Sequence, residues 1–168
     1  GENKILCGGS FVYGYCENTD FAYNKHDDFN INFEREIKKY MKRKIECVEE
    51  FHRIYKLGNS EKPIGKLKDG LEKLRFDLMA EENGEYLEAA KKGDVTEVAD
   101  ALGDMLYILC GTIIEHGMQN VIDDVFEEIH RSNLSKLDEN GNPIYREDGK
   151  VVKGPNYFPP NLKKFFEK

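Results

Sequence analysis

Residues 66–117 read KLKDGLEKLRFDLMAEENGEYLEAAKKGDVTEVADALGDMLYILCGTIIEHG, and this stretch decides the fold. Apolar residues recur three or four positions apart on both sides of Gly93, which is typical of two helices. We expect the first helix to run from about Lys66 to Lys92, where Gly93 stops it, and the second from Asp94 to about His116. Asp94 is the expected N-cap, with an acid three residues later as in a capping box. Because only two residues separate the helices, we expect an antiparallel pair.

The segments before and after this helix pair also have the periodicity of helices. Upstream, apolar side chains from about Phe33 to Tyr55 repeat every three or four residues, and Pro63 lies in the break that follows. Downstream, residues 118–129 place their apolar side chains on one stripe. Four amphipathic helices with short connections predict an all-α fold, an antiparallel four-helix bundle.

The C-terminal segment differs in character from the helical part. Asp148 and Gly149 lie between two short β-prone runs, which indicates a hairpin with a type I′ turn. Two consecutive prolines at 159 and 160 make the residues around them an extended arm. We therefore expect an irregular N-terminal extension, a helical core, and a hairpin with its arm, at residues 1–32, 33–137 and 138–168.

The composition limits the classes of function. A chain of 168 residues is long enough for one domain with a real core. The formal net charge of −7 argues against a protein that binds nucleic-acid polymers through their phosphates, because such binding needs a cationic face. No apolar run approaches the roughly 18 residues of a spanning helix, so we expect no membrane segment.

The cysteines and the N-terminus bear on the compartment. There is no C-x-x-C spacing, and reduced thiols in a cytoplasmic protein are the simpler interpretation for Cys7, Cys16, Cys47 and Cys110. The first residues lack the charged start and apolar middle of a signal peptide. Gly1 stands where an initiating Met would stand, so a targeting segment ahead of it stays open.

Acidic residues occupy unexpected positions in the central helix pair. At about 100° per residue, Glu82 and Glu85 continue the apolar stripe that includes Leu71 and Leu78. The second helix is apolar or small almost all round from 95 to 114. Its acids share an arc of roughly 60°, and they are Glu97, Asp100 and Asp104. We therefore expect both sets of acids to face the core.

Several carboxylates close together in a low dielectric need positive charge beside them. Arg75 is the only base near this stripe, so a divalent cation is the simplest counter-charge. The E-x-x-E of Glu82 and Glu85 and the E-x-x-D of Glu97 and Asp100 each place two carboxylates on adjacent turns of one face. Two such faces packed together offer four oxygen donors, which suit Mg²⁺ or Mn²⁺ rather than zinc.

The same residues resemble the E-E-x-x-E … E-x-x-D signature of the MazG-like and phosphoribosyl-ATP pyrophosphohydrolase-like superfamily. The similar segments are EENGE at 81–85, EVADALGDMLY at 97–107, IHRSNLSK at 129–136 and REDGK to KGPNY within 146–157. The resemblance covers about residues 43–162, and residues 1–42 have no counterpart in it.

The resemblance implies an all-α enzyme, a homodimer or a dimer of dimers, that hydrolyses a nucleoside triphosphate to the monophosphate and pyrophosphate. It implies that Mg²⁺ is bound by Glu82, Glu85, Glu97 and Asp100. Asp104, one turn beyond Asp100, is a further candidate ligand. Glu81 would orient or deprotonate the attacking water. Phosphate or sugar would be held by Asn133, Lys136, Lys153 and Tyr157, in the site of their own chain or in that of a second subunit.

Several alternatives stay open. House-cleaning of nucleotide pools is the expected role, with phosphoribosyl-ATP as the runner-up substrate. Glu49-x-x-His52 and Glu127-x-x-His130 have the spacing of carboxylate-bridged di-iron bundles. A non-catalytic helical binding module would use the apolar helix as a dimer core. The simplest alternatives are structural hydrogen bonds for the two histidines, a solvated helix face for the acids, and ordinary surface positions for the lysines.

Overall fold

The computed structural model describes residues 27–167, with side chains from residue 41 onward, and this part of the chain is all-α. It contains α1 (Asp27–Tyr55), α2 (Leu71–Lys92), α3 (Val95–Glu115), α4 (Ile122–Leu134) and the single-turn 3₁₀ helix η1 (Lys163–Phe165). No strand occurs among these residues, so the predicted fold class is confirmed. Most of the expected N-terminal extension, residues 1–26, lies outside the described part.

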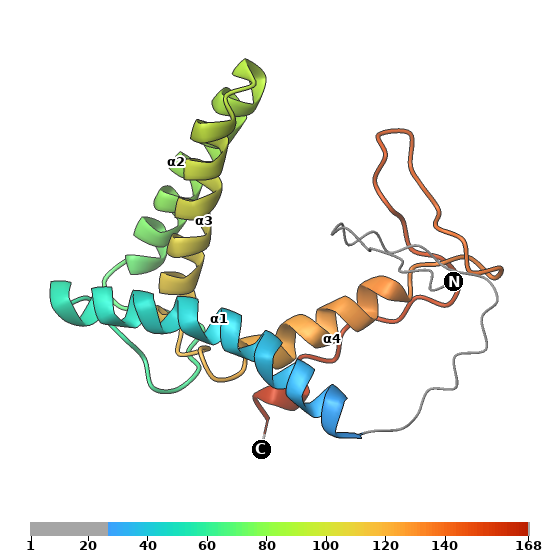
Figure 1. Ribbon diagram of the computed structural model, residues 1–168, viewed down its shortest axis with the longest axis horizontal. Helices are drawn as coiled ribbons and strands as arrows, with labels where there is room; N and C mark the ends of the chain where they lie inside the picture. The colour runs from blue at the N-terminus through green and yellow to red at the C-terminus, as the bar shows by residue number, and fades with distance from the viewer. Residues whose placement is uncertain (1–26, 168) are drawn as a thin grey trace, which may run out of the picture.

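Helices α2 and α3 lie side by side as an antiparallel hairpin, and they make the most extensive contact between helices (Figure 1). Gly93 ends α2 with φ 71°, a backbone conformation that residues with a Cβ rarely adopt. The side chain of Asp94 accepts hydrogen bonds from the N–H groups of Thr96 and Glu97. The expected antiparallel pair, its connection and its N-cap are confirmed.

Three helix boundaries differ from the expected ones. Helix α2 begins at Leu71 rather than near Lys66, because Asp69 and Gly70 have positive φ values that a right-handed helix cannot contain. Helix α1 begins at Asp27, before the expected start, and α4 begins at Ile122. These shifts leave the order and number of helices as predicted.

The core lies where α1 crosses α3. Its buried members are Ile45, Val48, Cys110, Ile113 and Ile114. Met118, in the connection between α3 and α4, and Ile122, the first residue of α4, pack against this cluster. Burial of one such aliphatic side chain stabilises a fold by about 1.5–3 kcal/mol. The α2–α3 hairpin projects away from this core, and α4 leaves it in another direction (Figure 1).

A polar junction joins the helices beside the core. His52 is buried, and its Nδ1 lies 3.0 Å from the carbonyl oxygen of Gly58 and 2.9 Å from Oδ1 of Asn59. A Cβ at Gly111 would lie 2.7 Å from a guanidinium nitrogen of Arg75. A side chain at position 111 would thus displace the end of the Arg75 side chain. His52 has the structural role that was the simplest alternative for it.

The predicted C-terminal hairpin is present, but its turn is not type I′. Tyr145 and Val151 form an antiparallel bridge, and the N–H of Gly149 donates to the carbonyl oxygen of Arg146 over 2.9 Å. Gly149 has φ 82°, whereas Asp148 has a negative φ. A type I′ turn needs positive φ at both central residues, so this is the three-residue loop in which glycine forms a bulge.

Two further sequence expectations concern the thiols and the membrane. Cys47 and Cys110 are free thiols, while Cys7 and Cys16 lie outside the described residues. Within residues 27–167, no helix combines the length and the apolar character that crossing a membrane requires.

Candidate metal and phosphate site

Six carboxylates of the α2–α3 hairpin make up the predicted metal and water site, and we call them the hairpin acids. They are Glu81, Glu82 and Glu85 on α2, and Glu97, Asp100 and Asp104 on α3. Glu82 and Asp104 stand at nearly equal distances along the chain from the turn between the helices, so they lie at the same level of the hairpin. The antiparallel pairing is therefore what brings acids from distant parts of the sequence together.

Electrostatics show which of these acids act on one another. The pKa of Glu82 is raised above its ordinary value, first by burial and then by the charges of neighbouring carboxylates. Those carboxylates are, in order of effect, Glu85, Asp104, Glu81 and Asp100. Both helices contribute to this effect, so Glu82 is the centre of a mutually repelling group. A cation bound there would relieve the repulsion.

Arg75, the base that the sequence places nearest to the acidic stripe, has other partners. Its Nε donates to Oγ1 of Thr112 over 3.0 Å, and its Nη2 donates to the carbonyl oxygen of Ile108. Burial lowers the pKa of the guanidinium, and the charge of Glu115 opposes this effect. Arg75 thus fastens α2 to the base of α3, and its donors are directed to groups other than the hairpin acids.

The expectation that these acids face the interior of a single chain is wrong. Glu82 is half-buried, and the other five hairpin acids are exposed. The reason is that α2 and α3 form a two-helix projection, so the face that a closed bundle would cover has no helix over it. Leu74 and Leu102 on the same projection are also about half exposed, at 51% and 49%. The predicted stripe of residues does lie on one face of the hairpin, but no other helix of the same chain covers that face.

The donor chemistry of the site fits a hard divalent ion. All six side chains offer carboxylate oxygens, the ligands that Mg²⁺ and Mn²⁺ prefer. Among the side chains described, however, no three acidic, histidine or cysteine groups already converge as a closed ligand set. The helices thus bring Glu82 into electrostatic range of Glu81, Glu85, Asp100 and Asp104, but not of Glu97, and the ligand roles of all these acids stay a prediction.

The predicted phosphate-binding residues gather at the C-terminal end of α4. The N–H of Gly154 donates to the carbonyl oxygen of Lys136 over 3.1 Å, which joins the returning chain to this end. Nζ of Lys153 lies 4.3 Å from the ring centroid of Tyr157. Asn133 lies in the last turn of α4, where its carbonyl oxygen accepts from the N–H of Lys136. The four predicted residues therefore form one group, which we call the basic group.

The basic group and the hairpin acids are not brought together within one chain. The α2–α3 hairpin and the C-terminal end of α4 extend in different directions from α1 (Figure 1). A site that uses both would need a second chain, in line with the shared site that the sequence resemblance implies.

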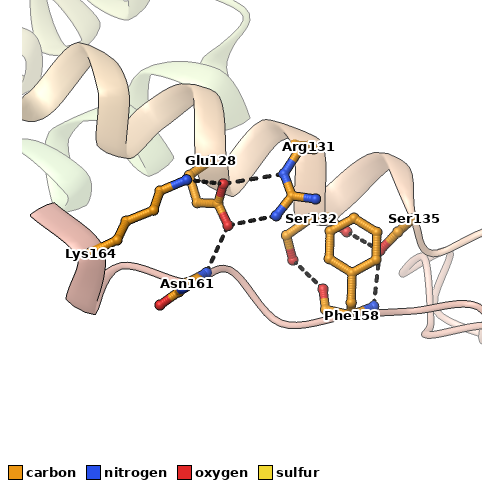
Figure 2. A network of polar contacts seen from close by, with 7 residues as sticks. All are labelled: Glu128, Arg131, Ser132, Ser135, Phe158, Asn161 and Lys164. Atoms are coloured by element: carbon orange, nitrogen blue, oxygen red, sulfur yellow. Dashed lines mark hydrogen bonds and ion pairs between the residues drawn. The ribbon is translucent and has the colours of Figure 1, made fainter.

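Two sets of residues escaped the sequence analysis. The ring of Phe51 packs at a tilt against Tyr55 and meets Tyr107 edge-on, with centroid distances of 4.4 and 5.6 Å, and all three rings are partly exposed. Their helical spacing resembles that of ordinary core residues. The second set ties the C-terminal segment to α4 and includes Glu128, Ser132 and Lys164 (Figure 2). An acid on a helix gives no sequence signal for a partner more than 30 residues away.

The comparisons with known proteins concern the family of the chain. Residues 48–133 match the model of the family described as phosphoribosyl-ATP pyrophosphohydrolase. The matched range contains the hairpin acids and Asn133 but ends before Lys136. The chain is also similar to the uncharacterized protein L479 of Acanthamoeba polyphaga mimivirus, with 32% identity over 81 residues. That alignment covers 48% of this chain and 29% of the viral protein, so the chain spans less than a third of that relative.

Proposed function

This chain belongs to the phosphoribosyl-ATP pyrophosphohydrolase family, and on that premise we propose that it hydrolyses a nucleoside or deoxynucleoside triphosphate to the monophosphate and pyrophosphate. Family membership supports a function of the pyrophosphohydrolase type. The observation that supports the finer proposal is the position of Glu82, half-buried among carboxylates of two helices that raise its pKa. Such a group favours the binding of Mg²⁺ and, through it, of a polyphosphate.

In this proposal the hairpin acids have different roles. Glu82, Glu85, Glu97 and Asp100 hold Mg²⁺, with Asp104 as a further ligand because it lies at the level of Glu82. Bound Mg²⁺ supplies charge neutralisation of the phosphate oxygens. Glu81 orients the attacking water and accepts its proton. The products require that the anhydride bond between the α- and β-phosphates breaks, with pyrophosphate as the leaving group.

The substrate phosphates would meet the basic group of a second chain. Lys136, Lys153 and Tyr157 lie away from the acids of their own chain, whereas a partner could bring them close. Large apolar side chains exposed on the α2–α3 hairpin, such as Leu74 and Leu102, support a homodimer or a dimer of dimers. Association would cover the face that one chain leaves open and complete the site.

The partly exposed rings of Phe51, Tyr55 and Tyr107 support a nucleoside rather than an inorganic polyphosphate as substrate. Tyr107 lies on α3 one turn beyond Asp104, so this surface adjoins the hairpin acids. Stacking of a base on an aromatic ring contributes about 1–3 kcal/mol and tolerates several bases. A broad choice of base would suit the house-cleaning of nucleotide pools.

Phosphoribosyl-ATP is the second candidate substrate, because the description of the matched family favours it. Its hydrolysis breaks the same kind of anhydride bond, so the same acids would serve. The two candidates differ in what the basic group and the aromatic rings must bind, and a substrate panel separates them.

The test is release of pyrophosphate from the common nucleoside and deoxynucleoside triphosphates and from phosphoribosyl-ATP, with and without Mg²⁺. We expect Mg²⁺-dependent turnover that falls at least about 100-fold in Glu82→Gln. Glu88→Gln is the matched control, because Glu88 lies on α2, is exposed and forms an ion pair with the nearby Lys91. Absence of turnover with every substrate in a folded protein would overturn the proposal, and tightly held iron would favour the di-iron alternative.

A further inference from the structure

The C-terminal arm, residues 154–167, is fastened to α4 by a buried carboxylate (Figure 2). The side chain of Glu128 is 3% exposed, yet it accepts hydrogen bonds from three sources. Arg131 donates from Nη2 over 2.8 Å and from Nε over 3.2 Å, the N–H of Asn161 donates over 2.7 Å, and Nζ of Lys164 over 2.8 Å. A buried carboxylate is tolerated only when it is paired and hydrogen-bonded in this way.

Further contacts follow the arm along the same face of α4. Oγ of Ser132 donates to the carbonyl oxygen of Phe158 over 2.8 Å, and the N–H of Phe158 donates to Oγ of Ser135 over 3.1 Å. The guanidinium of Arg131 lies 4.4 Å from the ring centroid of Phe158. Residues spaced three or four apart lie on one helix face, so successive turns of α4 hold successive parts of the arm. We call Glu128, Arg131, Ser132 and Ser135 the α4 clamp.

The near end of the arm is held equally closely. Gly154 approaches the end of α4 so tightly that a Cβ there would overlap the carbonyl oxygen of Leu137. Its N–H donates to the carbonyl oxygen of Lys136, and its own carbonyl oxygen accepts from the N–H of Tyr157. The chain is thus fixed at Gly154, directly after Lys153, and at Phe158, directly after Tyr157, so an anchor adjoins each of these two members of the basic group.

We propose that Glu128 is a positioning residue that, through the α4 clamp, holds Lys153 and Tyr157 where they bind the phosphates of the substrate. This inference rests on the proposed function. The arm has little secondary structure of its own besides the single turn of η1, so its position depends on contacts with α4. The clamp also joins the part of the chain that matches the family, which ends at residue 133, to the part that does not.

Glu128 is the group on which the clamp depends most, because it pairs with two cations at once. Without its charge, Arg131 and Lys164 would be left as neighbouring cations on two elements that must stay together. A glutamine could still accept from the N–H of Asn161 but could not neutralise either cation. We therefore expect Glu128→Gln to release the arm while leaving the α1–α3 core folded.

The first experiment measures the arm without reference to activity. Backbone hydrogen exchange in peptides that cover residues 154–164 should speed up at least about tenfold in Glu128→Gln, because an arm released from α4 opens more often and exposes its amides to water. Peptides of α3 should exchange as in the unaltered chain. Glu127→Gln is the matched control, since Glu127 is the exposed neighbour on the same helix. Unchanged exchange in the arm of Glu128→Gln would overturn the proposal.

The second experiment asks whether the clamp serves substrate binding. For the best substrate of the panel, we expect Glu128→Gln to raise KM about tenfold while kcat changes less than about twofold. Calorimetry measures the affinity for inorganic tripolyphosphate in the presence of Mg²⁺, and this affinity should fall by the same factor. A released arm with unchanged KM and unchanged tripolyphosphate binding would overturn the positioning role. Failure of the proposed function is recognised separately, because the unaltered chain itself would then show neither turnover nor binding.

A second pair of variants tests the proposal even if Glu128→Gln does not fold. Lys164 is half exposed and lies in the arm, outside the core. Lys164→Met should release the arm and raise KM in the same direction as Glu128→Gln but by less, because Arg131 and Asn161 still bind Glu128. Lys164→Arg keeps the charge and should restore both values. Equal behaviour of the Met and Arg variants would contradict the proposal.

Discussion

Carboxylates in the α4 clamp and in the α2–α3 hairpin have opposite electrostatic surroundings. Glu128 is buried among donors, and hydrogen bonds from Arg131 and Lys164 hold its pKa well below the ordinary value. Glu82 is half-buried among other acids, and burial together with their charges raises its pKa. Helix α4 thus contains an acid whose charge is fully compensated, whereas the hairpin contains acids whose charges are not.

This contrast separates a structural role from a binding role. A compensated carboxylate has its donors within the chain and fixes two segments against each other. Carboxylates that repel one another gain most from a ligand that brings positive charge. The same residue type therefore indicates a clamp in one region and a cation site in the other. Sequence position alone does not distinguish the two.

The largest effect on stability that we expect from this contrast concerns glycine. Gly154→Ala would force a Cβ against backbone that cannot move aside, and we expect a loss of about 3 kcal/mol or detachment of the arm. Gly84→Ala, on α2, would place its Cβ in open space and should stabilise the helix by about 0.5–1 kcal/mol. Denaturant unfolding measures both, and hydrogen exchange of the arm detects detachment. A neutral Gly154→Ala would mean that the arm is not closely packed.

The second prediction uses pH to separate a compensated acid from an uncompensated one. Because the folded-state pKa of Glu128 is lowered, its contribution to stability is fully present above the unfolded-state pKa of about 4.3. The contribution is lost as the pH falls below that value and through the folded-state pKa. We expect the unaltered chain to be more stable than Glu128→Gln at pH 7, with the gap closing below about pH 4.

Thermal unfolding of the two proteins from pH 7 to pH 3 measures this gap. Glu127→Gln serves as the control, and it should follow the unaltered chain throughout. A gap that stayed constant down to the lowest pH would show that the substitution acts through packing rather than through charge.

The helix pair and its end could be predicted because their signals are local. The period of apolar residues, the glycine stop and the Asp94 cap each involve neighbours within a few residues. The approach of Glu82 to Asp100 and Asp104 follows from a two-residue connection, which forces antiparallel pairing. What the sequence could not indicate is the exposure of these acids, because a periodic stripe defines a face without saying what covers it.

The α4 clamp was missed for a different reason. Its pairs join Glu128 to Asn161 and Lys164, so nothing in the local spacing distinguishes this acid from a solvated one. The turn of the C-terminal hairpin was also misjudged. Asp-Gly favours a type I′ turn, but the carboxylate of Asp148 binds Arg146 and the N–H of Lys150, and the bulged loop forms instead. Long-range and side-chain-specific contacts thus override the dipeptide preference.

The third prediction asks what covers the hairpin face. Leu74 lies on the apolar stripe that leads to Glu82 and is half exposed. If a second chain covers this face, Leu74→Asp should weaken association at least about tenfold, because a charge would be buried against apolar surface. Phe126→Asp, an exposed apolar position on α4, should leave association nearly unchanged. Sedimentation equilibrium measures both variants, and equal weakening by the two would contradict the proposed interface.

The smallest expected effect is a change in melting temperature, and its sign should differ between the hairpin acids and the α4 clamp. In the absence of divalent metal, Glu82→Gln removes one member of a repelling group, so we expect melting to rise by about 1–2 °C. Glu128→Gln, the same chemical change in the clamp, should lower melting by several degrees. Added Mg²⁺ should stabilise the unaltered chain and Glu128→Gln but not Glu82→Gln, because only the last loses a ligand. Destabilisation by Glu82→Gln without metal would mean that Glu82 is compensated within the chain, and the case for a cation site would then fail.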